Sequence, residues 1–167
     1  MVDMKKEHPP YRIAKGDVSS LIYEDSPQYD IWLKLILGST LAFTLVLGIV
    51  FLLVDLLGTW IMFGVTIFDA LLFNAVIPRR YQIFQDKLKI VLGNPFAFSI
   101  PLSTIKEVRP ASGSMAFAYW GIRLATSSSS VVEIVRSKGF NVVISPTNRD
   151  AFLDQLNQAL KAVSNLK

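Results

Sequence analysis

The chain has 167 residues, the size of one ordinary domain or of a smaller domain with an appendage. Hydrophobic residues make up 51% of the sequence and charged residues 18%, and the formal net charge is +4. Cysteine is absent from the sequence, which excludes disulfides and catalysis by a thiolate.

Two long apolar runs follow a polar N-terminal segment. Residues 35–54 carry no charge over twenty positions, which is long enough to cross the hydrocarbon core of a bilayer. A second run, residues 56–77, is interrupted only by Asp69 and Asn74. The alternative is a buried helical hairpin of a soluble protein, but two adjacent runs of this length leave too little polar chain to cover them. The pattern predicts two transmembrane helices, at about 33–54 and 57–77.

Basic residues flank both outer ends of this hairpin. Four lie in the N-terminal segment, Lys34 lies at the edge of the first span, and Arg79 and Arg80 follow the second. The connector around Asp55 has none. Because Lys and Arg accumulate on the cytoplasmic side, we expect a two-span protein of the cell membrane with both termini in the cytoplasm. The predicted organisation is a cytoplasmic tail (1–30), a transmembrane hairpin (31–77) and a C-terminal domain (78–167).

Asp69 and Asn74 are the polar residues predicted to lie within the membrane. A charged Asp at the centre of a span costs roughly 2.5–3.5 kcal/mol on insertion scales, so such a residue is often functional. If Asp69 is functional, it is a proton or ion site or a polar contact between protomers. If it is structural, it is a protonated or hydrogen-bonded carboxyl group that holds the hairpin through Thr40 or Thr44. A turn centred between residues 56 and 57 places Thr44 at the depth of Asp69.

After Pro78 the apolar residues alternate with polar ones over short segments, which is typical of strands. Residues 103–109 also show an apolar spacing of three, which indicates a bulge or a short helical turn. The serine run 127–130 predicts a plain turn. Seven strands are expected in all, at 81–85, 87–92, 96–100, 103–109, 121–126, 131–136 and 140–145.

The end of the chain predicts an amphipathic helix. Thr147 is expected to cap its N-terminus, with Asp150 three residues later as in a capping box. Apolar residues then recur at helical spacing and form one inward-facing stripe. The stripe predicts that the helix lies over a sheet or over the end of a barrel. It consists of Phe152, Leu156, Leu160 and Val163.

Seven strands and a C-terminal helix are the layout of the pleckstrin-homology (PH) superfold. The chain resembles the bacterial PH-like membrane proteins in three segments: YQIFQDKLKI, IPLSTIKEVRP and VVISPTNRDAFLDQL. The resemblance implies an α+β, mainly β, fold, in which a seven-stranded PH-like barrel with a C-terminal helix follows the transmembrane hairpin. Superfold members that bind phosphoinositides carry basic residues in a long first hairpin loop. Here that loop is only Gln85-Asp86, so head-group recognition is not expected there.

The predicted C-terminal domain is basic, with twelve Lys or Arg residues and five acidic residues over 78–167. A basic residue held near an anionic leaflet gains about 1 kcal/mol. We therefore expect non-specific contact with anionic membrane lipids. The alternative is that the basic surface only keeps the domain soluble beside the membrane. The residues expected to contact the lipid surface are Arg79, Arg80, Lys87 and Lys89.

A second candidate surface is the loop 110–121, PASGSMAFAYWG, which is rich in aromatic residues. Its large side chains either pack on the barrel or, if two or more are exposed, form an interfacial anchor or a protein-binding patch. This possible interaction loop contains Met115, Phe117, Tyr119 and Trp120.

The sequence contains no metal-ligand spacing and no phosphate-binding glycine loop. We therefore expect neither an enzyme, nor a metal, nor a cofactor, and membrane tethering argues against nucleic-acid binding. The predicted function is a non-catalytic, membrane-anchored PH-like interaction or scaffold module that faces the cytoplasm and binds a protein partner or itself. The alternative is a small oligomeric transport or permeability component that uses Asp69.

Overall fold

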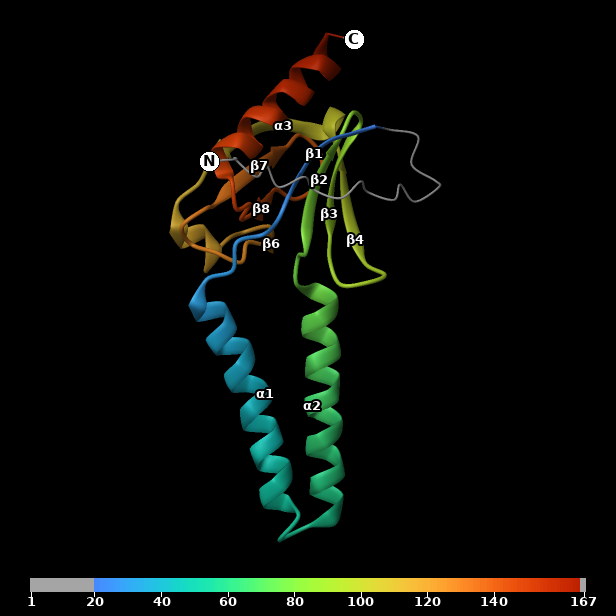
Figure 1. Cartoon of the computed structure of the whole chain (residues 1–167), viewed down its shortest axis with the longest axis vertical. Helices are drawn as coiled ribbons and strands as arrows, with labels where there is room; N and C mark the ends of the chain where they lie inside the picture. Colours follow the sequence, from blue (N-terminus) through green and yellow to red (C-terminus); the bar gives the residue numbers. More distant parts are fainter. Residues whose placement is uncertain (1–19, 166–167) are drawn as a thin grey trace, which may run out of the picture.

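The computed structural model describes residues 20–165. Most of the expected N-terminal tail, including its four basic residues, lies outside the described residues. Two long helices, α1 (Ile31–Phe51) and α2 (Leu56–Val76), form a hairpin at one end of the molecule. Strands and one further helix, α3 (Arg149–Ser164), form a compact domain at the other end (Figure 1).

Both hairpin helices are long and apolar enough to cross a membrane, as the sequence predicts. The bend between them is short because α2 begins at once after Asp55. The Asp55 carboxylate accepts hydrogen bonds from the backbone N–H groups of Leu57 and Gly58, at 3.1 and 2.9 Å. These bonds satisfy two of the donors that a helix N-terminus leaves open.

The two helices meet through small and polar residues. The hydroxyls of Thr44 and Thr66 are 3.0 Å apart, and Gly48 lies so close to Phe63 that an added Cβ would be 2.8 Å from its ring. The prediction that Thr44 matches the depth of Asp69 is wrong by three residues, or about 4.5 Å along a helix. The bend occupies residues between α1 and α2 and therefore precedes the turn centre that was assumed.

Within residues 20–165, eight strands form two four-stranded sheets. The first sheet is antiparallel, in the order β1-β2-β3-β4, with β1 (Leu21–Asp25), β2 (Arg80–Phe84), β3 (Lys87–Val91) and β4 (Ala97–Pro101). The second has the order β5-β7-β8-β6, with β5 (Ile105–Pro110), β7 (Val132–Arg136), β8 (Val142–Ile144) and β6 (Ile122–Leu124). The pair β6 and β8 is parallel.

The expected seven-stranded barrel is therefore wrong, although each of its seven predicted segments contains a strand. The additional strand is β1, which precedes the hairpin. The sheets do not close into a barrel: the chain passes from β4 to β5 through a 3₁₀ turn, Leu102–Thr104, and among residues 20–165 no strand of the first sheet pairs with a strand of the second. The apolar spacing of three, Ile105 to Val108, lies within β5, where the pairing with β7 shifts register between Ile105 and Glu107, as a bulge does.

The main core lies between the two sheets and beneath α3. Tyr81, Ile83, Ile134 and Phe152 are fully buried there. The Phe152 ring lies edge-on to Tyr81 and to Tyr23, with centroids 6.1 and 6.4 Å away, and so joins α3 to β2 and β1. The predicted apolar stripe of α3 is confirmed.

The predicted cap of α3 is wrong. The Thr147 hydroxyl donates to the carbonyl of Ser26 at 2.9 Å, and Asp150 accepts a hydrogen bond from Arg149. The side chain of the N-cap residue, Asn148, makes no capping hydrogen bond. The N-terminus of α3 is instead bound by the segment that precedes the hairpin.

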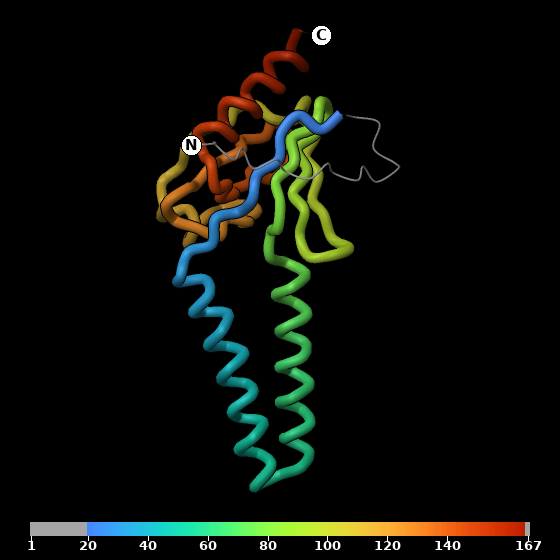
Figure 2. The backbone as a smooth tube through the Cα atoms, viewed as in Figure 1, coloured from blue at the N-terminus to red at the C-terminus, as the bar shows by residue number. Residues whose placement is uncertain are grey.

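The hairpin is inserted between two neighbouring strands of one sheet. Strand β1 leads into α1, and α2 leads into β2. The two strands pair antiparallel, with Asp25 opposite Tyr81. Figure 2 shows both arms of the hairpin leaving the same side of the domain. A domain that starts at residue 78 therefore lacks one strand of its first sheet.

Candidate functional site at the junction of hairpin and domain

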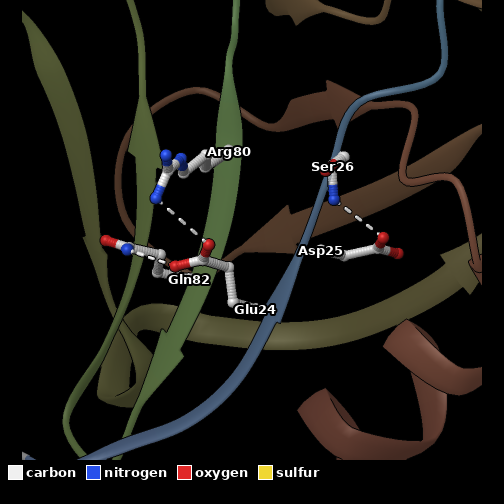
Figure 3. Close-up of polar contacts among 5 residues, drawn as sticks. All are labelled: Glu24, Asp25, Ser26, Arg80 and Gln82. Atoms are coloured by element: carbon white, nitrogen blue, oxygen red, sulfur yellow. Dashed lines mark hydrogen bonds and ion pairs between the residues drawn. The ribbon is translucent and has the colours of Figure 1, made fainter. Parts of the chain in front are cut away.

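The strap, which we define as residues 25–30, connects β1 to α1. Its first residue, Asp25, is buried, with 7% of its surface exposed. The carboxylate accepts hydrogen bonds from the backbone N–H of Ser26 at 2.7 Å and of Asn148 at 2.9 Å; the bond to Ser26 is drawn in Figure 3. A residue ahead of the hairpin thus serves as the anionic cap of the C-terminal helix.

The rest of the strap crosses to the second sheet. Pro27 forms an isolated bridge with Pro146, and the N–H of Gln28 donates to the carbonyl of Ser145 at 2.8 Å. The N–H of Asp30 donates to the carbonyl of Thr126 at 3.0 Å. These backbone bonds fix the chain up to the residue before α1, so that no slack remains between the domain and the first span.

The side chain of Asp30 is held by the serine run. Its carboxylate accepts hydrogen bonds from the Ser127 hydroxyl at 2.6 Å and from the N–H and hydroxyl of Ser128 at 2.6 and 2.8 Å. The indole of Trp32 donates a fourth bond at 3.1 Å. Partial burial acts to raise the pKa of Asp30, but these donors lower it below its ordinary value. The serine run therefore anchors the start of α1.

The second arm of the hairpin, α2, is fixed to the domain as firmly as the first, α1. The N–H of Arg79 donates to the carbonyl of Val91 at 2.7 Å, and its guanidinium donates to the side-chain carbonyl of Asn74. Asn74, predicted to be an intramembrane residue, lies in the last turn of α2. The hydroxyl of Tyr29 donates to the carbonyl of Pro78 and so connects the two arms directly.

The loop between β3 and β4 rests on the end of α2. The N–H of Gly93 donates to the carbonyl of Ala75 at 3.3 Å. A Cβ added at Gly93 would lie 1.6 Å from the carbonyl oxygen of Asn74, so this close approach requires glycine. The domain thus contacts α2 through a loop as well as through the chain itself.

A pocket of about 510 Å³ opens at this junction, and we call it the junction pocket. Burial raises the pKa of the Tyr29 hydroxyl, although the positive charge of Arg79 opposes the shift. Arg80 lies 3.4 Å from Glu24, which also accepts a hydrogen bond from Gln82 at 2.6 Å (Figure 3). The pocket is lined by Tyr29, Phe73, Asn74, Ile77, Arg79 and Arg80.

The four basic residues expected at the lipid surface are not grouped together. Arg79 and Arg80 follow α2 directly, and Arg80 is paired with Val91 at the end of β3 nearest the hairpin. Lys89 lies opposite Gln82 in the middle of the strand. Lys87 lies at the far end of β3, four residues or about 13 Å from Val91, with its ammonium 5.6 Å from the Phe84 ring centroid. Contact with lipid stays a prediction for all four residues.

The aromatic loop is divided between core and surface. Met115 and Tyr119 pack against a small second core that includes the buried Val143. Phe117 and Trp120 are 51% and 95% exposed. The Phe117 ring lies 4.7 Å from that of Trp32, in the first turn of α1, so the loop lies beside the hairpin. Two of the four aromatic-loop side chains are thus available at the surface.

A buried carboxylate fixes this loop. Glu133, 4% exposed, accepts hydrogen bonds from the Tyr119 hydroxyl at 2.7 Å and from Arg109 at 2.8 Å. Burial acts to raise the pKa of Glu133, but the two donors lower it below its ordinary value. Burial and the neighbouring carboxylate raise the pKa of Tyr119 to about 12. Each group has its partner, so the cluster is structural; the sequence offers no local signal for it.

Asp69 lies on α2, partly exposed, and the prediction that Thr40 or Thr44 holds it is wrong. The Thr40 hydroxyl donates to the carbonyl of Ile36, and that of Thr44 bonds within its own helix and to Thr66. Among the described residues, none forms a hydrogen bond with the Asp69 carboxyl group. No cluster of His, Cys, Asp or Glu that could hold a metal ion occurs in residues 20–165.

Residues 79–160 match the family model of the bacterial PH domain, which confirms the resemblance seen in the sequence. The match begins after α2 and so leaves out β1 and the strap, which the inserted hairpin separates from the rest of the domain. Comparisons with curated proteins and with solved structures find no match.

Proposed function

We propose that this chain, which carries a bacterial PH domain in residues 79–160, is a non-catalytic scaffold anchored in the cell membrane. The hairpin is the anchor, and the domain faces the cytoplasm. One observation carries the proposal: both arms of the hairpin enter the same sheet as the neighbouring strands β1 and β2, and hydrogen bonds fix each arm up to its helix. Such a domain is held at a set distance from the bilayer, as a scaffold requires.

The residues around the junction support this orientation. Phe117 lies against Trp32 at the start of α1, Trp120 in the same loop is almost fully exposed, and Arg79 and Arg80 follow α2. Trp favours the interfacial region of a bilayer, and Arg favours its cytoplasmic side. Both features suit a domain that lies against the cytoplasmic leaflet.

We place the binding surface for a protein partner at the end of the domain opposite the hairpin. The C-terminal half of α3 lies far from the hairpin (Figure 1). There a groove of about 430 Å³ separates α3 from β5, an edge strand of the second sheet. Its floor includes Ile105 and Val108, and its rim carries Lys106 and Lys161. We assign partner binding to this groove.

Cysteine labelling tests the anchoring and the topology. Single cysteines replace Ser20, Leu53 and Lys138, all exposed, in a chain that has no native cysteine. We expect an impermeant thiol reagent added outside to label only position 53. Labelling of position 138 from outside would place the domain on the other side of the membrane and remove the proposed cytoplasmic scaffold.

Crosslinking tests the partner surface. A photoreactive residue in place of Asn157, in the groove, should give a defined crosslinked product in native membranes, which mass spectrometry identifies. The matched control replaces Lys138, in the exposed turn between β7 and β8. Equal products from both positions would show that the groove does not select a partner.

A second candidate function, proton-coupled transport by an oligomer, rests on Asp69. This carboxyl group lies in a predicted span and has no hydrogen-bond partner among residues 20–165. The variant Asp69→Asn separates the two functions. A scaffold keeps its crosslinked partner and its assembly, whereas a transporter loses proton flux in reconstituted liposomes.

A further inference from the structure

We propose that the junction pocket binds one anionic phospholipid, with its phosphate at Arg79 and Arg80 and an acyl chain beside Phe73 and Ile77. This inference rests on the proposed membrane anchoring. It adds a defined lipid site to an anchor that otherwise needs only a non-specific attraction to the leaflet. The site is also distinct from the short turn at Gln85 and Asp86, which lies at the opposite end of β2.

The polar wall of the pocket has the chemistry of a phosphate site. Two guanidinium groups on consecutive residues line it, and planar guanidinium groups bind phosphate through paired hydrogen bonds. The Arg79 guanidinium bonds to the neutral amide of Asn74, so this bond leaves its charge available to an anion. Arg80 shares Glu24 with Gln82, and half of its side chain remains exposed.

Tyr29 defines one boundary of the site. Its hydroxyl donates to the carbonyl of Pro78, so the phenol proton is already used within the protein. The ring therefore acts as a wall and as a tie between the arms, and the arginines provide the contacts to the anion. This arrangement keeps the pocket at a fixed width.

The apolar wall argues for a lipid and against a soluble phosphate. Ile77 directly follows α2, and Phe73 lies one turn, or about 6 Å, deeper along the helix. The two helices are close together near their bend and diverge toward the domain (Figure 1). A phosphate bound at the arginines thus lies at the membrane boundary with apolar side chains below it. The volume, about 510 Å³, suits a head group, since ligand pockets range over roughly 300–1,000 Å³.

The test uses the purified full chain in a neutral detergent. We measure its thermal unfolding with added phosphatidylglycerol, with phosphatidylcholine of the same acyl chains, and with glycerol 3-phosphate. Phosphatidylglycerol should raise the unfolding temperature, and native mass spectrometry should find one retained lipid per chain. The zwitterionic lipid and the soluble phosphate should give neither effect.

Two double variants test whether the lipid binds in the junction pocket. In Arg79→Gln/Arg80→Gln the apparent affinity for phosphatidylglycerol should fall about tenfold or more, because two charge-assisted contacts are lost. The matched control, Lys138→Gln/Arg149→Gln, removes the same charge from surfaces outside the pocket and should bind as the unaltered chain does. The effect of lipid is measured from each variant's own unfolding temperature without lipid, because Arg79→Gln/Arg80→Gln also removes the contacts to Asn74 and Glu24.

Each other outcome overturns the proposal. Equal effects of the two lipids would mean that no anion is recognised, and an equal effect of glycerol 3-phosphate would mean that the site binds a soluble phosphate. Equal losses in both double variants would mean that only total charge matters. Alkaline extraction of membranes tests the anchoring separately. A chain released by this treatment contradicts the proposed function, whereas a chain that is retained but shows no lipid selectivity contradicts only the lipid site.

Discussion

The carboxylate of Asp25 accepts a hydrogen bond from the backbone N–H of Asn148 at 2.9 Å, across 123 positions of sequence. It joins the strand ahead of the hairpin to the helix at the end of the chain. Because Asp25 is buried, its removal leaves the N–H groups of Asn148 and Ser26 without their acceptor. The stability of the domain therefore depends on residues that a boundary at residue 78 would exclude.

Asp25→Ala should lower the free energy of unfolding of the domain by about 1–2 kcal/mol, the usual effect of losing a helix cap. Urea unfolding of the full chain in detergent, followed by circular dichroism, measures the change. Glu24→Ala is the control, since the adjacent, partly buried Glu24 carboxylate bonds to the side chains of Arg80 and Gln82 and not to the start of α3. A larger effect of Glu24→Ala would contradict the role of Asp25.

Restoring β1 should stabilise a soluble form of the domain. We compare residues 78–165 alone with a chain in which residues 20–30 are joined to residue 78 by a short flexible linker. The linker can be short because Tyr29 contacts Pro78. The joined form should unfold at a clearly higher urea concentration, because β2 regains its edge partner and Asp25 returns to α3. Equal midpoints would show that the strap adds no stability.

Gly93→Ala should separate the β3–β4 loop from the end of α2. The new Cβ would overlap the carbonyl oxygen of Asn74, so the backbone must move, at a cost of about 1–3 kcal/mol. Limited proteolysis of the full chain should then cut the loop faster. Gly38→Ala is the control, because a Cβ at Gly38 meets no atom within 4 Å. Equal cleavage of both variants would contradict the docking of the loop.

Tyr119→Phe should destabilise the domain by about 1–2 kcal/mol near neutral pH, because it removes a donor from a buried carboxylate. The pKa of folded Glu133 is lowered from 4.5, so its stabilising contribution is complete above that value and is lost as pH falls through the lower folded pKa. Without Tyr119 as a donor, the folded pKa of Glu133 rises toward 4.5, so the acid-side loss of stability becomes smaller and ends at a higher pH. Unfolding measured between neutral and acidic pH would reveal this shift, and parallel curves for both proteins would contradict it.

Phe152→Ala should cost about 3–5 kcal/mol, since the fully buried ring fills the core between Tyr81 and Tyr23. Lys161→Ala, on the solvent side of the same helix, should change stability by less than about 0.5 kcal/mol. The comparison uses unfolding by urea in the full chain. Similar losses would mean that α3 packs differently.

The sequence predicts those elements whose signal is local. The hairpin follows from the length of its apolar runs, and seven strands and α3 follow from their periodicity. Strand β1 was missed because LIYED lies beside a transmembrane run and alternates too briefly to stand out. Its partner, β2, lies beyond the whole hairpin, so only the folded chain brings the two together.

The candidate site divides in the same way. Arg79 and Arg80 stand out in the sequence because charge at the end of a span has a direct physical meaning. The anchoring of Asp30 by Ser127 and Ser128 could not be predicted, since the bonds cross 97 and 98 positions and a serine run has no specific local structure. The number of strands, likewise, does not determine whether a barrel closes: the eight strands of residues 20–165 pair within two separate sheets.

The insertion of the hairpin between β1 and β2 imposes an order on biosynthesis. Strand β1 leaves the ribosome before the hairpin and β2 after it; if the hairpin spans the membrane as proposed, the first sheet is completed only when both helices have crossed and returned the chain to its starting side. A chain that had inserted only one span would hold the two strands on opposite sides of the bilayer, with the edge of β2 unpaired. In the proposed membrane anchor, completion of this sheet therefore checks the topology, and a wrongly inserted copy would present an exposed strand edge, a feature of aggregation-prone chains.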